Sequence, residues 1–422
     1  MEKVLNYRTM RLLVVSQYFW PENFRINDLV AELVNRGHQV TVLTGLPNYP
    51  DGKVFKEFRD NPTFYSHYEG AEVIRVPLMP RGKSGIILAL NYLTFAISAS
   101  TLGLLKLHDR KFDAIFTCQL SPVTVGIPAV VIRATKKIPM VFWILDLWPE
   151  SLQAVGAVRS KIILRLIGRL VAKIYNRCDL ILVQSKSFIP AVAKYIAPTT
   201  RVQYFPSWSD LAFNVETSKA AIEIPKKKDC FTIVFTGNIG EAQDFPAILD
   251  AAERLKYFSN IRWLIVGDGR MAEWVTEEVK ARELYDCVFL LGRFPIERMP
   301  SFIKHADALL VTLKKESIFA LTIPGKLQSY LATGKPILAM INGEGARVVE
   351  ESGSGFTCPA GNSQSLADAV LRLSAMSSEE RDVMGKKGLE YTKREFDRSS
   401  LISRLELMLN QLIMAKSRAE IN

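Results

Sequence analysis

Short, almost uninterrupted apolar segments alternate with helical patterns along the whole chain, and this alternation constrains the fold more than any other feature. Strands without polar alternation are typical of parallel sheets that helices cover on both faces. In such sheets ligands bind outside the carboxyl ends of the strands, so the residues that follow each strand are the informative ones. The predicted strands are 11–17, 39–45, 72–77, 113–118, 140–146, 180–185 and 202–206 in the first half, and 231–237, 261–267, 287–292, 308–313, 336–341 and 355–359 in the second.

The two halves of the chain repeat one plan, which predicts two domains. A chain of 422 residues exceeds what a single hydrophobic core usually organises. The polar stretch 207–229, with Pro225 and a run of lysines, is suited to be a linker. We therefore expect an α/β protein in which two doubly wound Rossmann-like domains, 1–210 and 211–395, face each other across a cleft. The remaining residues, 396–422, predict a C-terminal helix, for which packing back on the N-terminal domain is one arrangement.

The cysteines indicate a reducing compartment. The five of them lie far apart, with no CxxC pair and no spacing typical of a metal site. This argues against a disulfide framework and against a zinc site. The first apolar run, "LLVVS", is too short for a secretory signal. We expect a cytoplasmic protein that binds no metal.

The net charge of +11 belongs to the first half of the chain. Residues 1–210 carry 26 Lys and Arg against 15 Asp and Glu, an excess of 11, whereas the second half is neutral. A one-sided basic domain is typical of proteins that bind nucleic acid or an anionic membrane surface. No nucleic-acid-binding module is recognisable and the aromatic residues are not interleaved with the basic ones, so we favour the membrane.

Glycine-rich turns and a lysine follow the strands of the second half and predict an anion site. Glycine permits close backbone approach, and N–H groups at a helix start can take a phosphate. One such turn is equally compatible with a simple chain reversal, but three followed by "PGK" at the start of a predicted 326–333 helix favour a site. Gly-x-Gly-x-x-Gly is absent after the first strand of either half, which argues against a dinucleotide oxidoreductase. The candidate residues are Gly237, Asn238, Gly240, Gly267, Asp268, Gly269, Arg270, Arg293, Pro324, Gly325, Lys326, Leu327, Gln328 and Ser329.

The order of these motifs resembles a known enzyme family. "TGNIG", "IVGDG", "HADALLV", "PGKLQSYLATGKPI" and "GEGARVVEESGSGF" are similar to the nucleotide-sugar-binding half of the retaining GT-B glycosyltransferases of family 4. In the first half, "QYFWPENFRINDLVAELVNRGHQVTVLTGLPNYP" and "WILDLWPESLQAVGA" resemble the branch typified by the N-acetyl-L-fucosamine transferase of O-antigen synthesis. The resemblance spans roughly residues 10 to 410.

The resemblance implies a nucleoside diphosphate sugar donor, with UDP favoured, bound by the second half, and an acceptor on the first half. It also implies transfer with retained configuration and no metal or cofactor. The departing diphosphate would then be met by protein donors, with Lys326 as first choice; the alternative for Lys326 is a solvated surface lysine. Gly267, Asp268 and Gly269 would line the base and ribose pocket, and Asn238 and Gly240 would lie near the diphosphate. For Arg270 and Arg293 salt bridging is the competing interpretation.

The chain departs from the family at two positions. Many members carry two glutamates eight residues apart before the final "G-x-P", the second of which contacts the ribose. The corresponding residues here are Leu321 and Ser329, and Glu316 is off register. A serine still offers a hydrogen bond to a hydroxyl, and Gln328 is adjacent. The loss of an acid near the diphosphate makes Lys326 more important.

In the first half, the candidate catalytic residues follow two predicted strands. Glu22 and Arg25 come after the first strand, where they can reach the cleft. Asp146 and Glu150 follow the fifth strand; Leu145 stands where many relatives have histidine. A turn or N-cap role is the alternative for Asp146. If the donor phosphate takes the acceptor proton, no side-chain base is required.

Two segments of the basic half predict a lipid-linked acceptor. Residues 86–105 carry no charge and are long enough for a membrane span, but their polar residues favour a helix packed on the sheet with one face open to lipid; a fully buried helix is the other alternative. Residues 159–177 form a basic amphipathic helix that suits an anionic membrane, or else an ordinary solvated face. We expect an undecaprenyl diphosphate saccharide as acceptor, at the inner face of the plasma membrane. The competing interpretations are a GDP-sugar transferase such as a fucosyltransferase and a non-catalytic subunit that binds nucleotide sugars.

Overall fold

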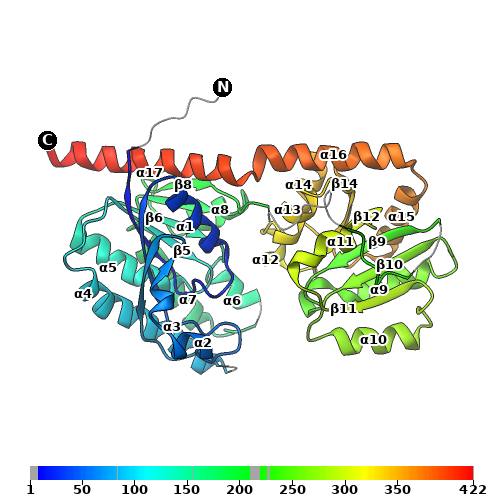
Figure 1. Cartoon of the computed structure of the whole chain (residues 1–422), viewed down its shortest axis with the longest axis horizontal. Coiled ribbons are helices and arrows are strands. Elements are labelled where there is room, and N and C mark those ends of the chain that lie inside the picture. Colours follow the sequence, from blue (N-terminus) through cyan, green and yellow to red (C-terminus); the bar gives the residue numbers. More distant parts are fainter. Residues whose placement is uncertain (1–7, 83, 155, 210–218, 226–228, 422) are drawn as a thin grey trace. The chain divides into compact units, whose positions relative to one another are not determined.

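The computed structural model describes residues 8–421 except 83, 155, 210–218 and 226–228. The chain divides into two compact units (Figure 1), of which unit 1 contains Met1–Pro206 with Ser399–Asn422 and unit 2 contains Ser207–Arg398. The boundaries lie a few residues from the predicted ones, and the last helix belongs to the same unit as the first half of the chain.

Unit 1 is built on an eight-stranded sheet in the order β3-β4-β2-β1-β5-β6-β7-β8. All neighbouring strands are parallel except β3 and β4, which are antiparallel. The strands are β1 (Arg11–Val15), β2 (Gln39–Gly45), β3 (His67–Tyr68), β4 (Ala71–Val76), β5 (Ala114–Gln119), β6 (Met140–Ile144), β7 (Leu180–Val183) and β8 (Arg201–Tyr204). The helices are α1 (Arg25–Asn35), α2 (Lys56–Asp60), α3 (Gly85–Ser98), α4 (Leu104–Lys106), α5 (Gly126–Lys136), α6 (Glu150–Ala154), α7 (Lys161–Tyr175), α8 (Phe188–Ala193) and α17 (Arg398–Ile421).

Unit 2 contains a six-stranded, wholly parallel sheet in the order β11-β10-β9-β12-β13-β14. The strands are β9 (Phe231–Thr236), β10 (Ile261–Val266), β11 (Val288–Gly292), β12 (Ala308–Thr312), β13 (Ile337–Met340) and β14 (Gly355–Cys358). The helices are α9 (Phe245–Arg254), α10 (Ala272–Ala281), α11 (Met299–Ile303), α12 (Ser317–Ala320), α13 (Gly325–Leu331), α14 (Glu344–Ser352), α15 (Ser363–Ser374) and α16 (Ser378–Glu395).

Both sheets have the doubly wound topology that the apolar runs predict. In unit 1 the strand order runs outward in one direction from β1 and in the opposite direction from β5. In unit 2 it runs outward in one direction from β9 and in the opposite direction from β12. Ligands bind at such a switch point because the loops on its two sides diverge there. Every predicted strand is present, and central strands such as β6 and β10 are buried along their whole length. The two-residue β3 was not predicted, because it is too short to show a pattern.

The helix α17 is fastened to unit 1 by a buried ionic cluster. The Glu406 carboxylate lies 2.8 Å from the Arg36 guanidinium and 2.7 Å from His38 Nε2, and its residue is 3% exposed. Burial alone would raise the pKa of Glu406, but hydrogen bonds from His38 and Arg36 outweigh this and lower it. The C-terminal helix α17 is thereby joined to the turn that follows α1.

The predicted apolar helix of unit 1 exposes most of its surface. It runs as α3, a π-helical turn at Ala99–Gly103 and α4. Among the described residues, Gly85–Lys106 is the one helix long and apolar enough to cross a membrane, and only 22% of its most apolar stretch is buried. The fully buried helix is therefore wrong. Its exposed large apolar side chains are Ile86, Ile87, Leu90, Leu93, Ile97, Leu102 and Leu105.

Candidate functional site

A cavity of about 410 Å³ lies at the carboxyl ends of β9, β10 and β11 in unit 2. It gathers residues from the three predicted turns, with Asp268 and Arg293 as its charged side chains. Its apolar wall comes from two residues that the sequence did not suggest, Phe294 and Met299. The lining residues are Gly237, Asn238, Val266, Gly267, Asp268, Gly269, Arg293, Phe294 and Met299.

The glycines of this edge are required by the packing of one turn against another. A Cβ atom on Gly267 would lie 1.8 Å from the carbonyl oxygen of Gly237, and one on Gly269 would lie 2.4 Å from that of Ile239. Hydrogen bonds join the same turns, from Gly237 N to Val266 O at 2.8 Å and from Ile239 N to Asp268 O at 2.8 Å. The expectation that these glycines serve mainly the close approach of a phosphate is thus incomplete, because two backbones already touch there.

Lys326 is placed at the same edge by the helix α13. Tyr330, one turn further along that helix, accepts a hydrogen bond from Thr236 N at 2.7 Å, which fixes α13 against the end of β9. The Nζ atom of Lys326 then lies 3.4 Å from the centre of the Phe235 ring. A Cβ atom on Gly237 would lie 3.3 Å from Lys326 Cε, so the lysine passes directly beside the first turn.

The electrostatic environment of Lys326 is unusual for a lysine. Burial lowers its pKa to about 7, and no carboxylate contributes to offset this. Within the part of the chain that the structure describes, no ion pair to Lys326 is formed. The interpretation of Lys326 as a solvated surface lysine is therefore wrong. A largely buried ammonium without a counter-charge favours binding of an anion, because an anion would restore the energy that burial costs.

This arrangement coincides with the topological switch point of unit 2. Gly237 follows β9, whereas Lys326 stands in the segment after β12, the neighbouring strand on the other side of the reversal. The structure therefore brings Gly237, Asn238, Gly267, Asp268, Gly269 and Arg293 together around one cavity, with Lys326 against the Gly237 turn.

The other predicted residues of unit 2 do not line the cavity. Gln328 Nε2 donates to Ser207 O at 2.7 Å, and Ser329 Oγ donates to Gly325 O at 3.3 Å; both side chains are buried. The idea that they offer free groups to a ribose hydroxyl is not supported by this geometry. Leu327 is part of the core, and Gly240, Arg270, Pro324 and Gly325 lie outside the lining.

In unit 1, Glu22 has a structural position. Its residue is 3% exposed, and its carboxylate accepts backbone hydrogen bonds from Phe19 N at 3.2 Å, Asn48 N at 2.8 Å and Tyr49 N at 2.7 Å. Burial raises the pKa of Glu22 in spite of these bonds and of the Arg75 charge. Glu22 therefore holds the loops after β1 and β2 together, and the prediction that it reaches into a cleft is wrong.

The remaining first-half candidates differ in their surroundings. Asp146 follows β6, and its carboxylate accepts a hydrogen bond from Trp148 Nε1 at 2.9 Å while the residue stays partly exposed. Glu150 opens α6 and accepts from the Tyr195 hydroxyl at 3.0 Å. Arg25 lies 3.7 Å from Asp28 on its own helix. Of the three carboxylates Glu22, Asp146 and Glu150, Asp146 is the one that a substrate at the carboxyl edge of the sheet would meet.

An aromatic patch, which we define as Tyr18, Tyr49, Tyr92 and Trp148, extends from Asp146 along the carboxyl edge of the unit 1 sheet, with Trp148 as the member bonded to Asp146. The ring centres of Tyr18 and Tyr49 are 5.6 Å apart, and those of Tyr92 and Trp148 are 6.0 Å apart. The sequence did not single out these residues. A signal was present for Tyr49 and Trp148, because "NYP" and "LWP" each place an aromatic residue and a proline after a strand, as "FWP" does just after Tyr18.

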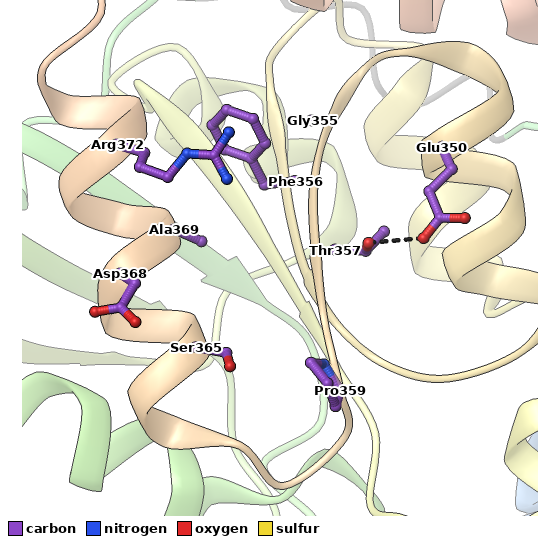
Figure 2. A pocket seen from close by; sticks show the side chains of 9 residues that line it. All are labelled: Glu350, Gly355, Phe356, Thr357, Pro359, Ser365, Asp368, Ala369 and Arg372. Atoms are coloured by element: carbon purple, nitrogen blue, oxygen red, sulfur yellow. Dashed lines mark hydrogen bonds between the residues drawn. The ribbon is translucent and has the colours of Figure 1, made fainter.

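A second hollow of unit 2 is occupied by its own side chains. It has a volume of about 450 Å³ beside the edge strand β14 and the helix α15. Figure 2 shows the Arg372 guanidinium over the Phe356 ring, 4.2 Å from its centre, and Thr357 bonded to Glu350 at 2.8 Å. Asp368 accepts a hydrogen bond from Gln364 Nε2 at 2.9 Å, so each charged group of the hollow already contacts a neighbouring side chain, and we assign no site to it. The described residues contain no cluster of His, Cys, Asp and Glu that could hold a metal ion.

Comparison with known proteins gives consistent results for both units. A family model described as "Glycosyl transferase 4-like domain" matches residues 23–208, and one described as "Glycosyl transferases group 1" matches residues 230–376. A probable glycosyltransferase of Pseudomonas aeruginosa, WbjE, is 29% identical over 270 residues, 60% of this chain and 66% of that protein. The putative colanic acid biosynthesis glycosyl transferase WcaI of Escherichia coli is 26% identical over 348 residues, 77% of this chain and 82% of that protein. The crystal structure of Anabaena HepE with UDP-glucose superimposes with a TM-score of 0.63 at 15% identity, covering 97% of this chain and all of HepE.

Proposed function

We propose that this chain, which belongs to the glycosyltransferases and has their GT-B fold, transfers a sugar from a nucleoside diphosphate donor to a lipid-linked saccharide. Two relatives are named as glycosyltransferases of colanic acid and amylovoran biosynthesis, so we place the chain in a pathway of the O-antigen or capsule type. The observation that carries the proposal is the position of Lys326, a largely buried cation without a counter-charge, beside the Gly237 turn at the switch point of unit 2.

The donor would lie in the unit 2 cavity. The nucleobase would lie against Phe294 and Met299 and the ribose near Asp268. The diphosphate would lie between Asn238 and Lys326, which stands beside the Gly237 turn. UDP is the favoured nucleotide because HepE, which shares the fold, is seen with UDP-glucose. The resemblance of the first half to the fucosamine-transferring branch suggests N-acetyl-L-fucosamine as the sugar. A GDP-sugar is the alternative donor.

The reaction we propose breaks the bond between the anomeric carbon and the donor phosphate oxygen and forms a bond from the acceptor hydroxyl oxygen on the same face of the sugar. Negative charge develops on the departing diphosphate, and Lys326 would stabilise it more in the transition state than in the ground state. The acceptor proton passes to the departing phosphate oxygen, so no protein base is needed. Asp146, held by Trp148, would orient the acceptor hydroxyl.

A membrane-bound acceptor is supported by the surface of unit 1. The first half of α7 exposes Ile162 to 69% and Leu166 to 56%, next to exposed basic residues of the same helix. Together with the exposed apolar face of α3, this is the combination that binds anionic membrane interfaces. We propose that the protein is a cytoplasmic, peripheral enzyme of the inner membrane face.

The test is a donor panel with the full-length protein. UDP- and GDP-sugars are incubated with a polyprenyl diphosphate N-acetylglucosamine acceptor, and products are read by mass spectrometry. Product from at least one donor is expected, formed about 10²–10³-fold more slowly when Lys326 is replaced by Met. A second candidate function is a non-catalytic subunit that binds nucleotide sugars. The observation in its favour is that Leu321 and Ser329 stand where many family members have glutamates. UDP binding with no turnover of any donor would support that candidate instead.

A further inference from the structure

We propose that Arg81, together with the neighbouring aromatic patch, binds the diphosphate of the lipid-linked acceptor, and that the exposed face of α3 accompanies the acceptor's apolar chain into the membrane. The inference rests on the proposed function and names a binding residue that neither the sequence motifs nor the relatives indicate.

The position of Arg81 is fixed from two sides. Its backbone N–H donates to Asn48 Oδ1 at 2.9 Å, which joins the loop after β4 to the loop after β2. Its guanidinium lies over the Tyr49 ring, 4.8 Å from the centre. Burial raises the pKa of the Tyr18 and Tyr92 phenols, and the Arg81 charge works against that rise in both, so Arg81 lies close to both hydroxyls.

Arg81 has neighbours that orient it but none that neutralise it. Among the residues that the structure describes, no carboxylate lies within ion-pair distance of its guanidinium, and the side chain is only partly buried. A planar guanidinium held over an aromatic ring presents its N–H groups edge-on, and this fork matches two oxygens of a phosphate. An anion is therefore the complementary ligand.

The helix α3 is locked to the same loops. Asn91, fully buried on this helix, accepts from Gln17 Nε2 at 2.8 Å and donates to Met79 O at 2.6 Å. The Tyr18 hydroxyl also donates to Asn91 Oδ1 at 3.3 Å. The cation and the helix are thus parts of one rigid block, with Arg81 four residues before the first residue of α3.

The outer face of α3 identifies the kind of anion. Ile86, Leu90, Leu93 and Ile97 are 77%, 40%, 48% and 62% exposed. From Ile86 to Ile97 the helix rises roughly 17 Å, which is close to half the thickness of a hydrocarbon core. A phosphate that is joined to a long apolar chain would pair with the Arg81 cation and also cover the apolar face of α3. A soluble phosphate would pair only with the cation.

The aromatic patch accounts for the saccharide. Tyr92 lies beside Trp148, which in turn donates to Asp146. Tyr18 and Trp148 are buried, whereas Tyr49 is 38% exposed and Tyr92 is partly exposed. A sugar attached to a phosphate at Arg81 would therefore extend over Tyr49 and Tyr92 toward Asp146, the carboxylate that we place next to the reacting hydroxyl. Aromatic faces pack well against sugar rings because both bury apolar surface.

Binding of farnesyl diphosphate, a short isoprenoid diphosphate, tests this inference by calorimetry. The full chain is first saturated with UDP, so that the donor cavity is filled, and UDP binding is itself recorded as a check of the proposed function. We expect Arg81→Ala to weaken farnesyl diphosphate at least about tenfold and Arg81→Lys to weaken it less. Farnesol, without phosphates, should bind weakly and equally to all variants. The matched control is Arg201→Ala, an exposed arginine on β8 at the other end of the sheet.

Each outcome has one meaning. If UDP fails to bind, the proposed function is wrong, while the effect of Arg81 on farnesyl diphosphate still decides the inference. If Arg81→Ala binds farnesyl diphosphate as the wild type does, or if Arg201→Ala loses as much affinity, the inference is wrong.

Flotation with phosphatidylglycerol vesicles distinguishes binding of the acceptor diphosphate from binding of membrane headgroups. Loss of flotation in Arg81→Ala with farnesyl diphosphate binding intact would make Arg81 a membrane anchor and overturn the assignment. Thermal unfolding of both Arg81→Ala and Arg81→Lys, expected to match the wild type, excludes misfolding as the cause.

Discussion

The ammonium of Lys326 lies 3.4 Å from the centre of the Phe235 ring, held there by the helix α13, whose Tyr330 is bonded to Thr236, the next residue of the same strand. The ring attracts the charge, yet burial still lowers the lysine pKa to about 7. The positive charge at the carboxyl edge of the unit 2 sheet is thus fixed in place but has no counter-charge. A bound diphosphate would supply that counter-charge.

Binding of UDP should consume a proton. Near pH 8 the free lysine is largely neutral because its pKa is about 7, and a bound diphosphate favours the protonated form. Calorimetry in two buffers of different ionisation enthalpy should show uptake of a fraction of a proton at pH 8 and little at pH 6. UDP affinity should fall as the pH rises above 7. Uptake that is unchanged in Lys326→Met would contradict this.

The same lysine predicts how stability depends on pH. In the unfolded chain its pKa is about 10.5, so between pH 7 and 10.5 the unfolded state binds more protons than the folded state. The contribution of Lys326 to the free energy of unfolding should therefore rise across that window. Lys326→Met should be more stable than the wild type at pH 7, and the difference should vanish toward pH 10.5. Lys280→Met, at an exposed position on α10, is the control and should show no such trend.

Glu22→Gln should affect stability rather than chemistry. An amide presents an NH₂ group to backbone donors that now meet a carboxylate, which should cost about 2–4 kcal/mol in the free energy of unfolding. Urea unfolding measures this, with the exposed Glu57→Gln as control. Turnover of the folded fraction should remain. A variant with wild-type stability and no turnover would return Glu22 to the catalytic candidates.

Glu406→Gln should loosen α17 from unit 1. Breaking a buried ion pair costs about 3–5 kcal/mol because the partner charges stay behind. Hydrogen exchange should therefore increase in the last helix and around Arg36 and His38, and not in unit 2. Because the folded pKa of Glu406 is lowered, its stabilisation should be complete above about pH 4.5 and lost as the pH falls through the lower folded value. Unchanged exchange in α17 would show that the cluster does not hold it.

Membrane binding should depend on the basic face of α7. Reversal of two charges in Arg165→Glu/Arg169→Glu should weaken binding to phosphatidylglycerol vesicles at least about thirtyfold, since each of the two basic residues near such a surface contributes about 1 kcal/mol. Flotation of the wild type should also decline with salt. The matched control, Lys111→Glu/Arg201→Glu, changes the net charge equally on exposed residues outside α7. Equal loss in both variants would mean that net charge alone governs binding.

The fold could be predicted from the sequence because its strands are buried on both faces and read as apolar runs. The strand ends were placed too far by one or two residues in cases such as 11–17, observed as Arg11–Val15, since Ser16 and Gln17 already belong to the turn. The glycine turns were found because they follow strands directly, and Lys326 was found because it stands in "PGK" at the start of a helix. Each of these motifs consists of a few consecutive residues, so it can be recognised in the sequence without knowledge of distant contacts.

The parts that could not be predicted depend on partners far away in the chain. Glu22 is turned inward by N–H groups of Asn48 and Tyr49, and Gln328 by the carbonyl of Ser207. No local pattern encodes these bonds. The same holds for Arg81, whose significance lies in its contact with Tyr49 and in the exposed helix that follows.

The most direct test of the account is the rate of sugar transfer by the wild type and by Lys326→Met, with Lys280→Met as control. The rate is measured as product mass from a UDP-sugar and a polyprenyl diphosphate acceptor. Loss of one preorganised cationic donor should reduce the rate constant about 10²–10³-fold, with thermal unfolding showing a folded protein and Lys280→Met remaining fully active. Turnover by Lys326→Met at the wild-type rate would contradict the central claim that this lysine meets the departing diphosphate.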